Sequence, residues 1–450
     1  MILFSRKTSR RARRQAIACH PGQQRSPSNK NVLMASVLGA MLAIAPVTHA
    51  LAAPLEPIPG ATVESLRDWL IANNPQLQAM QLQTDAAQAG VYPAGALPDP
   101  VASVSLLGID RDHPSLLPGN VGSTVYQVRQ SFPLWGKRRL AREAAQQEVQ
   151  AIDFERDAVA LDLLSQAERS YVRYWHAGES VKVVDRIITL LEQVEDIASV
   201  RYGLGVAAQQ DSIRAQVERT TTQRERIERL SLQQQETASL NAVLGRSADA
   251  PLTEPAMQPV LAIRQASLAE ALRNLEHGDH PLLRADQALA GAARSNVELE
   301  SRNRFPDISL GLGAMQRGTA LDSYEVMLEV EIPFQQHARR ERERRSRLLE
   351  DAALARAEAS RIELQGRLGT AWVRWSSARE QRQLIENTLL PQSDANFKSA
   401  LASYQVGEVD FATLLAALQA WQGTDLARLD TLRDELLSAA DVRAIEGNLP

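Results

Sequence analysis

Side chains that bind soft or borderline metal ions are few and scattered in this 450-residue chain. The only cysteine is Cys19, and Met315 and Met327 form no run. Zinc and copper sites usually need several such ligands at short spacing, for example two histidines four residues apart on a helix. The histidines after residue 100 show no such pair: His113, His176, His277, His280 and His337. We therefore expect no metal site and no cofactor.

Motifs that support catalysis are also missing from the sequence. We find no nucleophile with a nearby base, no phosphate-binding glycine loop and no paired-carboxylate motif. The chain is therefore predicted not to be an enzyme.

The most regularly spaced acidic residues alternate with apolar ones. Glu325, Glu329 and Glu331 form one side of a period-two pattern whose other side is Tyr324, Val326, Leu328, Val330 and Ile332. This pattern is typical of a membrane β-strand that lines a wet lumen, although a strand of a soluble sandwich would also show it. By phase, Arg129 on another strand would face the same lumen. Repeated by symmetry, the glutamates would favour cations, whereas ordinary lumen polarity is the plainer interpretation.

Basic residues gather directly after the predicted strands, in two clusters that begin at Lys137 and Arg339. We predict that they meet lipid phosphates at a membrane interface: Lys137, Arg138, Arg139, Arg339 and Arg340. A solvated helix face with partners such as Glu341 and Arg345 is the alternative. The net charge is −4 and glutamates interleave with the arginines, so nucleic-acid binding is not expected.

The elements that hold these residues are predicted to occur twice. Alternating patterns predict strands at about 101–109 and 123–133, and again at about 307–316 and 323–333. Helical patterns precede each pair, and a long helical hairpin follows each, at 137–245 and 337–446. Ordered matches recur about two hundred residues apart, such as Tyr171-Val-Arg-Tyr174 and Trp372-Val-Arg-Trp375. We predict a first repeat at 53–255 and a second at 256–450.

The long helices are predicted to pack along narrow seams and to turn once each. Aromatic residues make up only 4% of the chain, and the stripe that begins at Leu140 and Ala144 is rich in alanine, as in coiled coils. A helix from Lys137 to the first turn would be on the order of 100 Å long. The turn signals are Tyr202-Gly-Leu-Gly205 and Tyr404-Gln-Val-Gly407.

Residues 1–52 are predicted to be a signal peptide with a long leader. Lys30 precedes an apolar run from Val32 to Val47, which ends before the small-x-small site Ala50-Leu51-Ala52. A retained anchor and a wrongly assigned start codon are the alternatives. Cys19 lies inside this leader, so the mature chain would lack disulfides.

The order helix, strand pair, long helix, Tyr-x-x-Gly turn and helix, repeated once, resembles the TolC family of trimeric outer-membrane exit ducts. Within that family, Gln130-Ser-Phe-Pro-Leu-Trp-Gly-Lys-Arg138 is similar to the Gln-x-Phe-Pro-x-Pro-Gly-Lys-Arg signature of the heavy-metal branch, the CusC- and CzcC-like ducts. Trp135 replaces the second proline, and Ala96-Leu-Pro-Asp-Pro100 fits the same branch. The resemblance implies a mainly α fold with a small β part. In a homotrimer, four strands per chain would form a 12-stranded transmembrane β-barrel continuous with a long α-helical periplasmic barrel.

The resemblance also implies a function and partners. It implies a passive exit duct in the outer membrane of a Gram-negative bacterium, projecting into the periplasm. A proton-driven inner-membrane pump of the RND type and a periplasmic adaptor (membrane fusion protein) would deliver heavy-metal cations, either Cu and Ag or Co, Zn and Cd. A multidrug or type I secretion duct of the same fold is an alternative. A soluble periplasmic coiled-coil scaffold or adaptor is an alternative from another class.

For the turns, the resemblance implies a periplasmic tip that closes the duct. The family's tip tyrosine, glycine and aspartate match Tyr404, Gly407 and Asp211, and we expect the Tyr404 to Asp211 hydrogen bond to join neighbouring helix pairs. The first turn keeps Tyr202 and Gly205. The family's tip arginine falls on Val409, and its two constriction aspartates fall on Thr413 and Ala416, so those charges are lost here. Asp410 or Glu408 would supply a displaced charge or simply face solvent.

Overall fold

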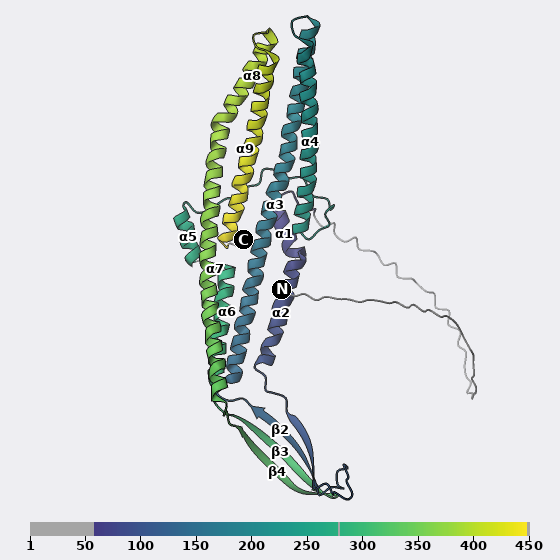
Figure 1. Cartoon of the computed structure of the whole chain (residues 1–450), viewed down its shortest axis with the longest axis vertical. Helices are drawn as coiled ribbons and strands as arrows, with labels where there is room; N and C mark the ends of the chain where they lie inside the picture. Colours follow the sequence, from purple (N-terminus) through teal and green to yellow (C-terminus); the bar gives the residue numbers. More distant parts are fainter. Residues whose placement is uncertain (1–57, 278–279, 448–450) are drawn as a thin grey trace, which may run out of the picture. The chain divides into compact units, whose positions relative to one another are not determined.

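The computed structural model describes residues 58–277 and 280–447, so the predicted signal peptide lies outside the described residues. One order of elements occurs twice in the described part (Figure 1). The first set is α1 (Val63–Asn73), α2 (Pro75–Ala94), β1 (Val101–Leu107), β2 (Ser123–Phe132), α3 (Lys137–Gly203) and α4 (Gln209–Val243). The second set is α5 (Leu268–His277), α6 (Pro281–Arg302), β3 (Asp307–Arg317), β4 (Ala320–Glu331), α7 (Gln336–Leu384), the π-helical turn η1 (Ile385–Leu389), α8 (Leu390–Val406) and α9 (Phe411–Ile445).

Helix α3 runs without interruption for 67 residues, about 100 Å at the rise of an α-helix. It contains no proline, and Gly178 is the one glycine before its last residue. The corresponding path in the second half is divided, because the π-helical turn η1 separates α7 from α8. Pro391 is the second residue after this turn and has no N–H to donate, so the wider turn lies where the α-helical ladder would lose a bond.

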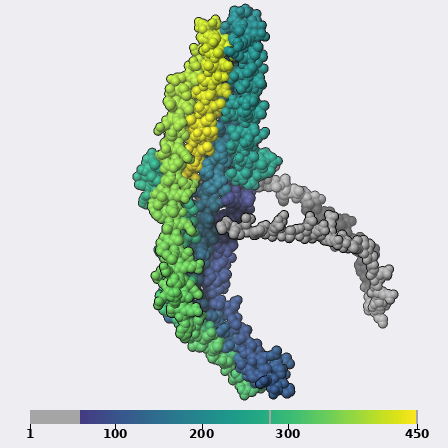
Figure 2. Space-filling model, in the orientation of Figure 1, coloured from purple at the N-terminus to yellow at the C-terminus, as the bar shows by residue number. Residues whose placement is uncertain are grey.

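The helices pack side by side through small residues. Helix α3 contacts α2, α4, α6 and α9, and α9 also contacts α7 and α8. Figure 2 shows the yellow surface of α9 flanked by α7 and α8 on one side and by α4 on the other. The buried positions of α3 include Leu140, Ala144, Ala151 and Ala167, which belong to the alanine-rich stripe seen in the sequence. Burial is therefore distributed in clusters along the helices.

The four strands form one antiparallel sheet in the order β1-β2-β3-β4. Its register places side chains of one kind on each face. On one face, Val128 pairs with Leu312, and Leu312 with Val326. On the other face, Gln127 pairs with Gly313, and Gly313 with Glu325. Strands β1 and β4 are the two edges, and each has a neighbour on one side only.

No helix in the described ranges 58–277 and 280–447 has both the length and the apolar character needed to cross a membrane.

Candidate functional site

The polar face of the sheet holds the predicted lumen residues. The Arg129 guanidinium donates to Glu329 across β3 with an Nη1 to Oε2 distance of 2.6 Å, so these two charges offset each other. Glu331 lies 3.8 Å from Arg339. Within the described part of the chain, Glu325 makes no ion pair or hydrogen bond through its side chain. The sheet therefore carries an internal charge pair and two acidic groups with weak compensation or none.

The opposite face of the sheet is apolar and exposed. The exposed fraction is 81% for Tyr324 and 78% for Val326. Other large apolar side chains on this face are also exposed: Val104, Tyr126, Val128, Leu310, Leu312, Leu328 and Val330. Monomeric soluble proteins rarely expose a contiguous apolar surface of this kind. The face is suited to lipid or to another apolar surface.

The structure corrects the prediction for Lys137, which does not face lipid phosphates. Its side chain is only 9% exposed, and its ammonium donates to Asp307 Oδ2 at 2.8 Å and to the Phe305 carbonyl at 3.0 Å. The Leu134 amide also donates to Asp307, at 2.9 Å. A buried lysine needs such partners because desolvation of its charge is costly. Lys137 therefore ties the start of α3 to the start of β3.

Trp135 adds to this junction between β2 and α3. It has a positive φ of 62°, a conformation that bulky residues rarely adopt. Its indole N–H donates to the Pro306 carbonyl at 2.8 Å, and its ring lies 5.1 Å from the ring of Phe305. These contacts hold the residue in its strained conformation, so Trp135 has a structural role of its own where the resembled signature has proline.

The arginines of the two basic clusters divide into two groups. Arg138 donates to the Gly95 carbonyl and Arg339 to the Asn303 carbonyl, so both hold the end of a preceding helix. Arg139 and Arg340 are exposed, and Arg139 pairs with Glu143 one turn along the helix. Arg139 and Arg340 are accessible, and their contact with lipid phosphates stays a prediction.

The two turns between long helices form the tip: α3 to α4, and α8 to α9. Figure 1 shows both turns at the end of the helices opposite the sheet. Gly205 and Gly407 have φ values of 75° and 85°, the left-handed conformation that glycine adopts without strain. Tyr202 is 47% exposed, whereas Tyr404 is 1% exposed. Only the second tyrosine is therefore part of the core at the tip.

The Tyr404 hydroxyl donates to Asp211 Oδ2 at 3.3 Å, and this bond joins α8 to α4 within one chain. The expectation that the bond joins these two residues agrees with this geometry, and both partners belong to the same copy. Burial, together with the negative charge of Asp211, raises the pKa of Tyr404 to about 12. The hydroxyl therefore keeps its proton and remains a donor at physiological pH.

The remaining tip residues do not form a charged ring in the chain. Asp410 caps the N-terminus of α9, since its carboxylate accepts from the Thr413 amide at 2.9 Å and from the Thr413 hydroxyl at 2.6 Å. The bond from the Thr413 hydroxyl lowers the pKa of Asp410. Glu408 accepts from the Ser403 hydroxyl, and Ala416 is exposed on α9. Asp410 and Glu408 thus have local structural partners.

Sequence reasoning missed two residues at the tip, Arg201 and Phe411. The Arg201 guanidinium lies 4.4 Å above the Tyr404 ring, a cation–π contact, and it also donates to the Val206 carbonyl. The Phe411 ring meets the Tyr404 ring edge-on at 5.7 Å. Arg201 directly precedes the Tyr202 turn, which is the signal that could have drawn attention to it. It supplies a positive group at the tip, whereas the position of the family's arginine is Val409.

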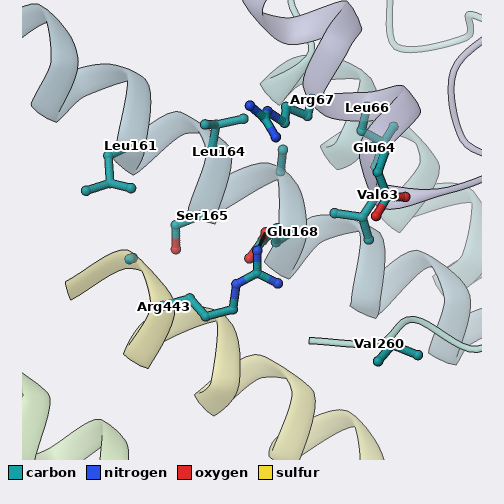
Figure 3. Close-up of a pocket in the computed structure, with 12 residues that line it drawn as sticks. Val63, Glu64, Leu66, Arg67, Leu161, Leu164, Ser165, Glu168, Val260 and Arg443 are labelled. Carbon is teal, nitrogen blue, oxygen red and sulfur yellow. Dashed lines mark ion pairs between the residues drawn. The ribbon is translucent and has the colours of Figure 1, made fainter. Parts of the chain in front are cut away.

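A cavity of about 190 Å³ lies among α1, α3, the C-terminal turns of α9 and Val260 (Figure 3). Figure 3 shows Glu168 and Arg443 facing one another across it, and their side chains form an ion pair of 3.3 Å. Burial raises the pKa of Glu168, and the nearby arginines oppose that rise. The cavity contains no arrangement of nucleophile and base. In the ranges 58–277 and 280–447, no group of three or more His, Cys, Asp or Glu residues could hold a metal ion.

Comparison with known proteins finds one family model that covers most of the chain. The model described as "Outer membrane efflux protein" matches residues 66–246 and 272–448. The chain is similar to the cobalt-zinc-cadmium resistance protein CzcC of Cupriavidus metallidurans, with 23% identity over 365 residues, which are 81% of this chain and 84% of CzcC.

Solved structures of outer-membrane channels share the fold. A structure of CusC has a TM-score of 0.74 and 18% identity, and the match covers 87% of this chain and 93% of CusC. A structure of the outer-membrane channel OprN has a TM-score of 0.73 and 17% identity, with 87% and 94% covered. At this level of identity the likeness concerns the fold.

Proposed function

The chain belongs to the outer membrane efflux protein family, and we propose that three copies form an exit duct for heavy-metal cations. The observation that carries the duct is the sheet, which has an exposed apolar face and two edges without a partner strand in the described chain. Four strands cannot close into a barrel, and open edges do not occur in a lipid-exposed sheet. Three copies would supply twelve strands and would turn the apolar faces toward lipid.

The polar face of the sheet would then line the lumen. Glu325, Glu331 and the Arg129–Glu329 pair would recur around the axis, with a net negative charge that attracts cations. The long helices would extend into the periplasm, where a periplasmic adaptor and a proton-driven inner-membrane pump would deliver the substrate.

Similarity to CzcC, a cobalt-zinc-cadmium resistance protein, supports metal cations as the substrate class. The Gln130 to Arg138 motif supports the same choice. Cobalt, zinc and cadmium are the first cations to test, and copper and silver are the second.

Deletion of the gene tests the substrate class. We expect the deletion strain to become sensitive to cobalt, zinc or cadmium, or to copper or silver, and the cloned gene to restore resistance. Growth on organic toxicants is measured in parallel. Sensitivity confined to organic toxicants would assign the duct to multidrug export, and it would overturn the metal proposal.

A further inference from the structure

The junction of β2 with α3 contains a lock between the two halves of the chain, formed by Lys137, Leu134 and Asp307. Asp307 stands at the start of β3 and accepts from the Lys137 ammonium and from the Leu134 amide. The pairing of Phe132 with Ile308 brings these segments together, because the end of β2 lies beside the start of β3. The strand register therefore determines which junctions meet.

The duplication gives each member of this lock an equivalent in the other half. Pro133 and Pro333 both follow a strand end, and counting on from them aligns Lys137 with His337. Leu97-Pro98-Asp99 and Phe305-Pro306-Asp307 both precede the first strand of a pair, which aligns Asp99 with Asp307.

A hydrogen bond at a similar place in each half supports the second alignment, because Gly95 and Asn303 have the same spacing as Asp99 and Asp307, whereas Arg138 and Arg339 differ by one position from the first alignment. Arg138 donates to the Gly95 carbonyl in the first half, and Arg339 donates to the Asn303 carbonyl in the second. In both halves an arginine at the start of the long helix thus holds the end of the helix that precedes the strand pair. The two junctions are built on one plan.

The equivalent lock is not closed within one chain. Asp99 precedes β1 and His337 follows β4, and these strands are the opposite edges of the sheet. Both side chains are exposed. Among residues 58–277 and 280–447, no side chain or backbone group bonds to the Asp99 carboxylate or to the His337 ring. Asp99 and His337 are thus equivalent in position to Asp307 and Lys137, which form an ion pair, but neither has a partner in the described chain.

We propose that His337 of one copy binds Asp99 of a second copy, and that this contact repeats the Lys137–Asp307 lock at each boundary between copies. The inference rests on the proposed assembly into a ring, in which β4 of one copy lies beside β1 of the next. A carboxylate beside an imidazole is a charge-assisted pair when the histidine is protonated, and a hydrogen-bonded pair when it is neutral. The partner at this surface is therefore another copy of the same chain.

The same alignment fixes the register between copies. Val128 pairs with Leu312 within the chain. The equivalent pair between copies is Leu328 of one copy with Val104 of the next. Neighbouring pairs on that face become Val330 with Ala102 and Val326 with Leu106, so apolar side chains meet apolar side chains along the boundary. A slip of one residue would place them against serines, because strand side chains alternate between faces.

The second lock differs from the first in its backbone. The Phe334 amide, equivalent to the Leu134 amide, closes a local turn on the Ile332 carbonyl at 3.0 Å. The lock between copies thus consists of the side-chain pair alone. The first lock is formed by a lysine, whose ammonium donates to the aspartate. Replacement of His337 by lysine should therefore strengthen the contact.

Cysteine cross-linking tests the ring and its register. The protein is purified from membranes with Cys19 replaced by serine and with the pair Val104→Cys and Leu328→Cys. We expect oxidation to join chains covalently up to the trimer. The control pair Ser103→Cys and Leu328→Cys has its thiols on opposite faces and should not cross-link.

Thermal dissociation of the complex tests the lock itself at neutral pH. We expect H337K to raise the dissociation midpoint by a few degrees and Asp99→Asn to abolish that rise. Gln336→Lys adds the same charge one position away, and its effect should not depend on Asp99. Cross-linking without any dependence of H337K on Asp99 would overturn the lock and leave the ring in place. Failure of the designed pair to cross-link would overturn both.

Discussion

Tyr404 is the residue that links the tip of the helices to the proposed closure of the duct. Its ring is buried between Arg201 and Phe411, and its hydroxyl donates to Asp211. A hydrogen bond to a carboxylate stabilises more than one between neutral groups. The contact joins α8 to α4, so these two helices can separate at the tip only if the bond is broken.

We predict that Tyr404→Phe combined with Asp211→Ala raises single-channel conductance in planar bilayers. Loss of about 1 kcal/mol of stabilisation would shift a closed-to-open equilibrium roughly fivefold. Tyr202→Phe is the matched control, since Tyr202 is exposed at the other turn and should leave conductance unchanged. Equal conductance in the double variant and the wild type would show that this bond does not hold the tip closed.

The pKa of Tyr404 gives the same bond a pH dependence. A tyrosine whose pKa rises from 10.0 to about 12 holds its proton more tightly when folded. Its contribution is present in full below pH 10 and is lost as pH rises toward 12. The effect of the Tyr404–Asp211 bond on conductance should therefore stay constant between about pH 6 and about pH 9.

Part of the site at the tip could be predicted from the sequence. Tyr404 and Asp211 were found through a turn motif and a resemblance, and the structure places their side chains in contact. Their proposed role in closing the duct stays a prediction. Arg201 was missed, because its contact with Tyr404 joins residues about two hundred positions apart and depends on helix packing, which no local motif reports.

At the scale of elements, the junction between sheet and helices is a set of specific contacts. The Lys137 ammonium, the Leu134 amide and the Trp135 indole all reach the segment from Phe305 to Asp307. Removal of one member of a buried ion pair of this kind destabilises the folded protein, because the other charge is left without compensation. The junction therefore fixes how α3 enters the sheet.

We predict that Lys137→Met destabilises the folded protein by about 1–3 kcal/mol, because it leaves the Asp307 carboxylate without its cation. Arg139→Met is the control, since the exposed Arg139–Glu143 pair contributes at most about 0.5 kcal/mol. Thermal unfolding of the detergent-extracted protein measures both variants. Equal midpoints for the two variants would contradict the buried role of Lys137.

The periodicity of apolar residues predicted where the helices and strands lie. It did not predict which side chains are buried at the ends of these elements. Alternation placed strands near 101–109 and 323–333, and the structure has β1 at Val101–Leu107 and β4 at Ala320–Glu331. Lys137 stands among arginines that look equivalent in sequence, and only the register of β2 against β3 brings it to Asp307. The π-helical turn η1 was likewise not predicted, since one proline in a helical run does not specify how the ladder adjusts.

At the scale of the molecule, a duplicated chain forms a sheet that is apolar on one face and open at both edges. The predicted family, fold class and outer-membrane assignment are confirmed by the family match and by the similarity to known channels. That family consists of efflux proteins and not of enzymes, in agreement with the sequence prediction. The architecture of the whole molecule was the most predictable feature. The two halves of the sequence match in order along the whole chain, and these matches do not depend on any single contact.

The mass of the protein released from membranes tests the proposed duct most directly. Apolar outer faces and β4 to β1 pairing between copies require detergent for extraction and an assembly of three chains. We predict that the protein stays in the membrane fraction without detergent, and that the extracted complex has three times the mass of the mature chain. Release as a single chain without detergent would contradict the duct and favour a soluble periplasmic scaffold.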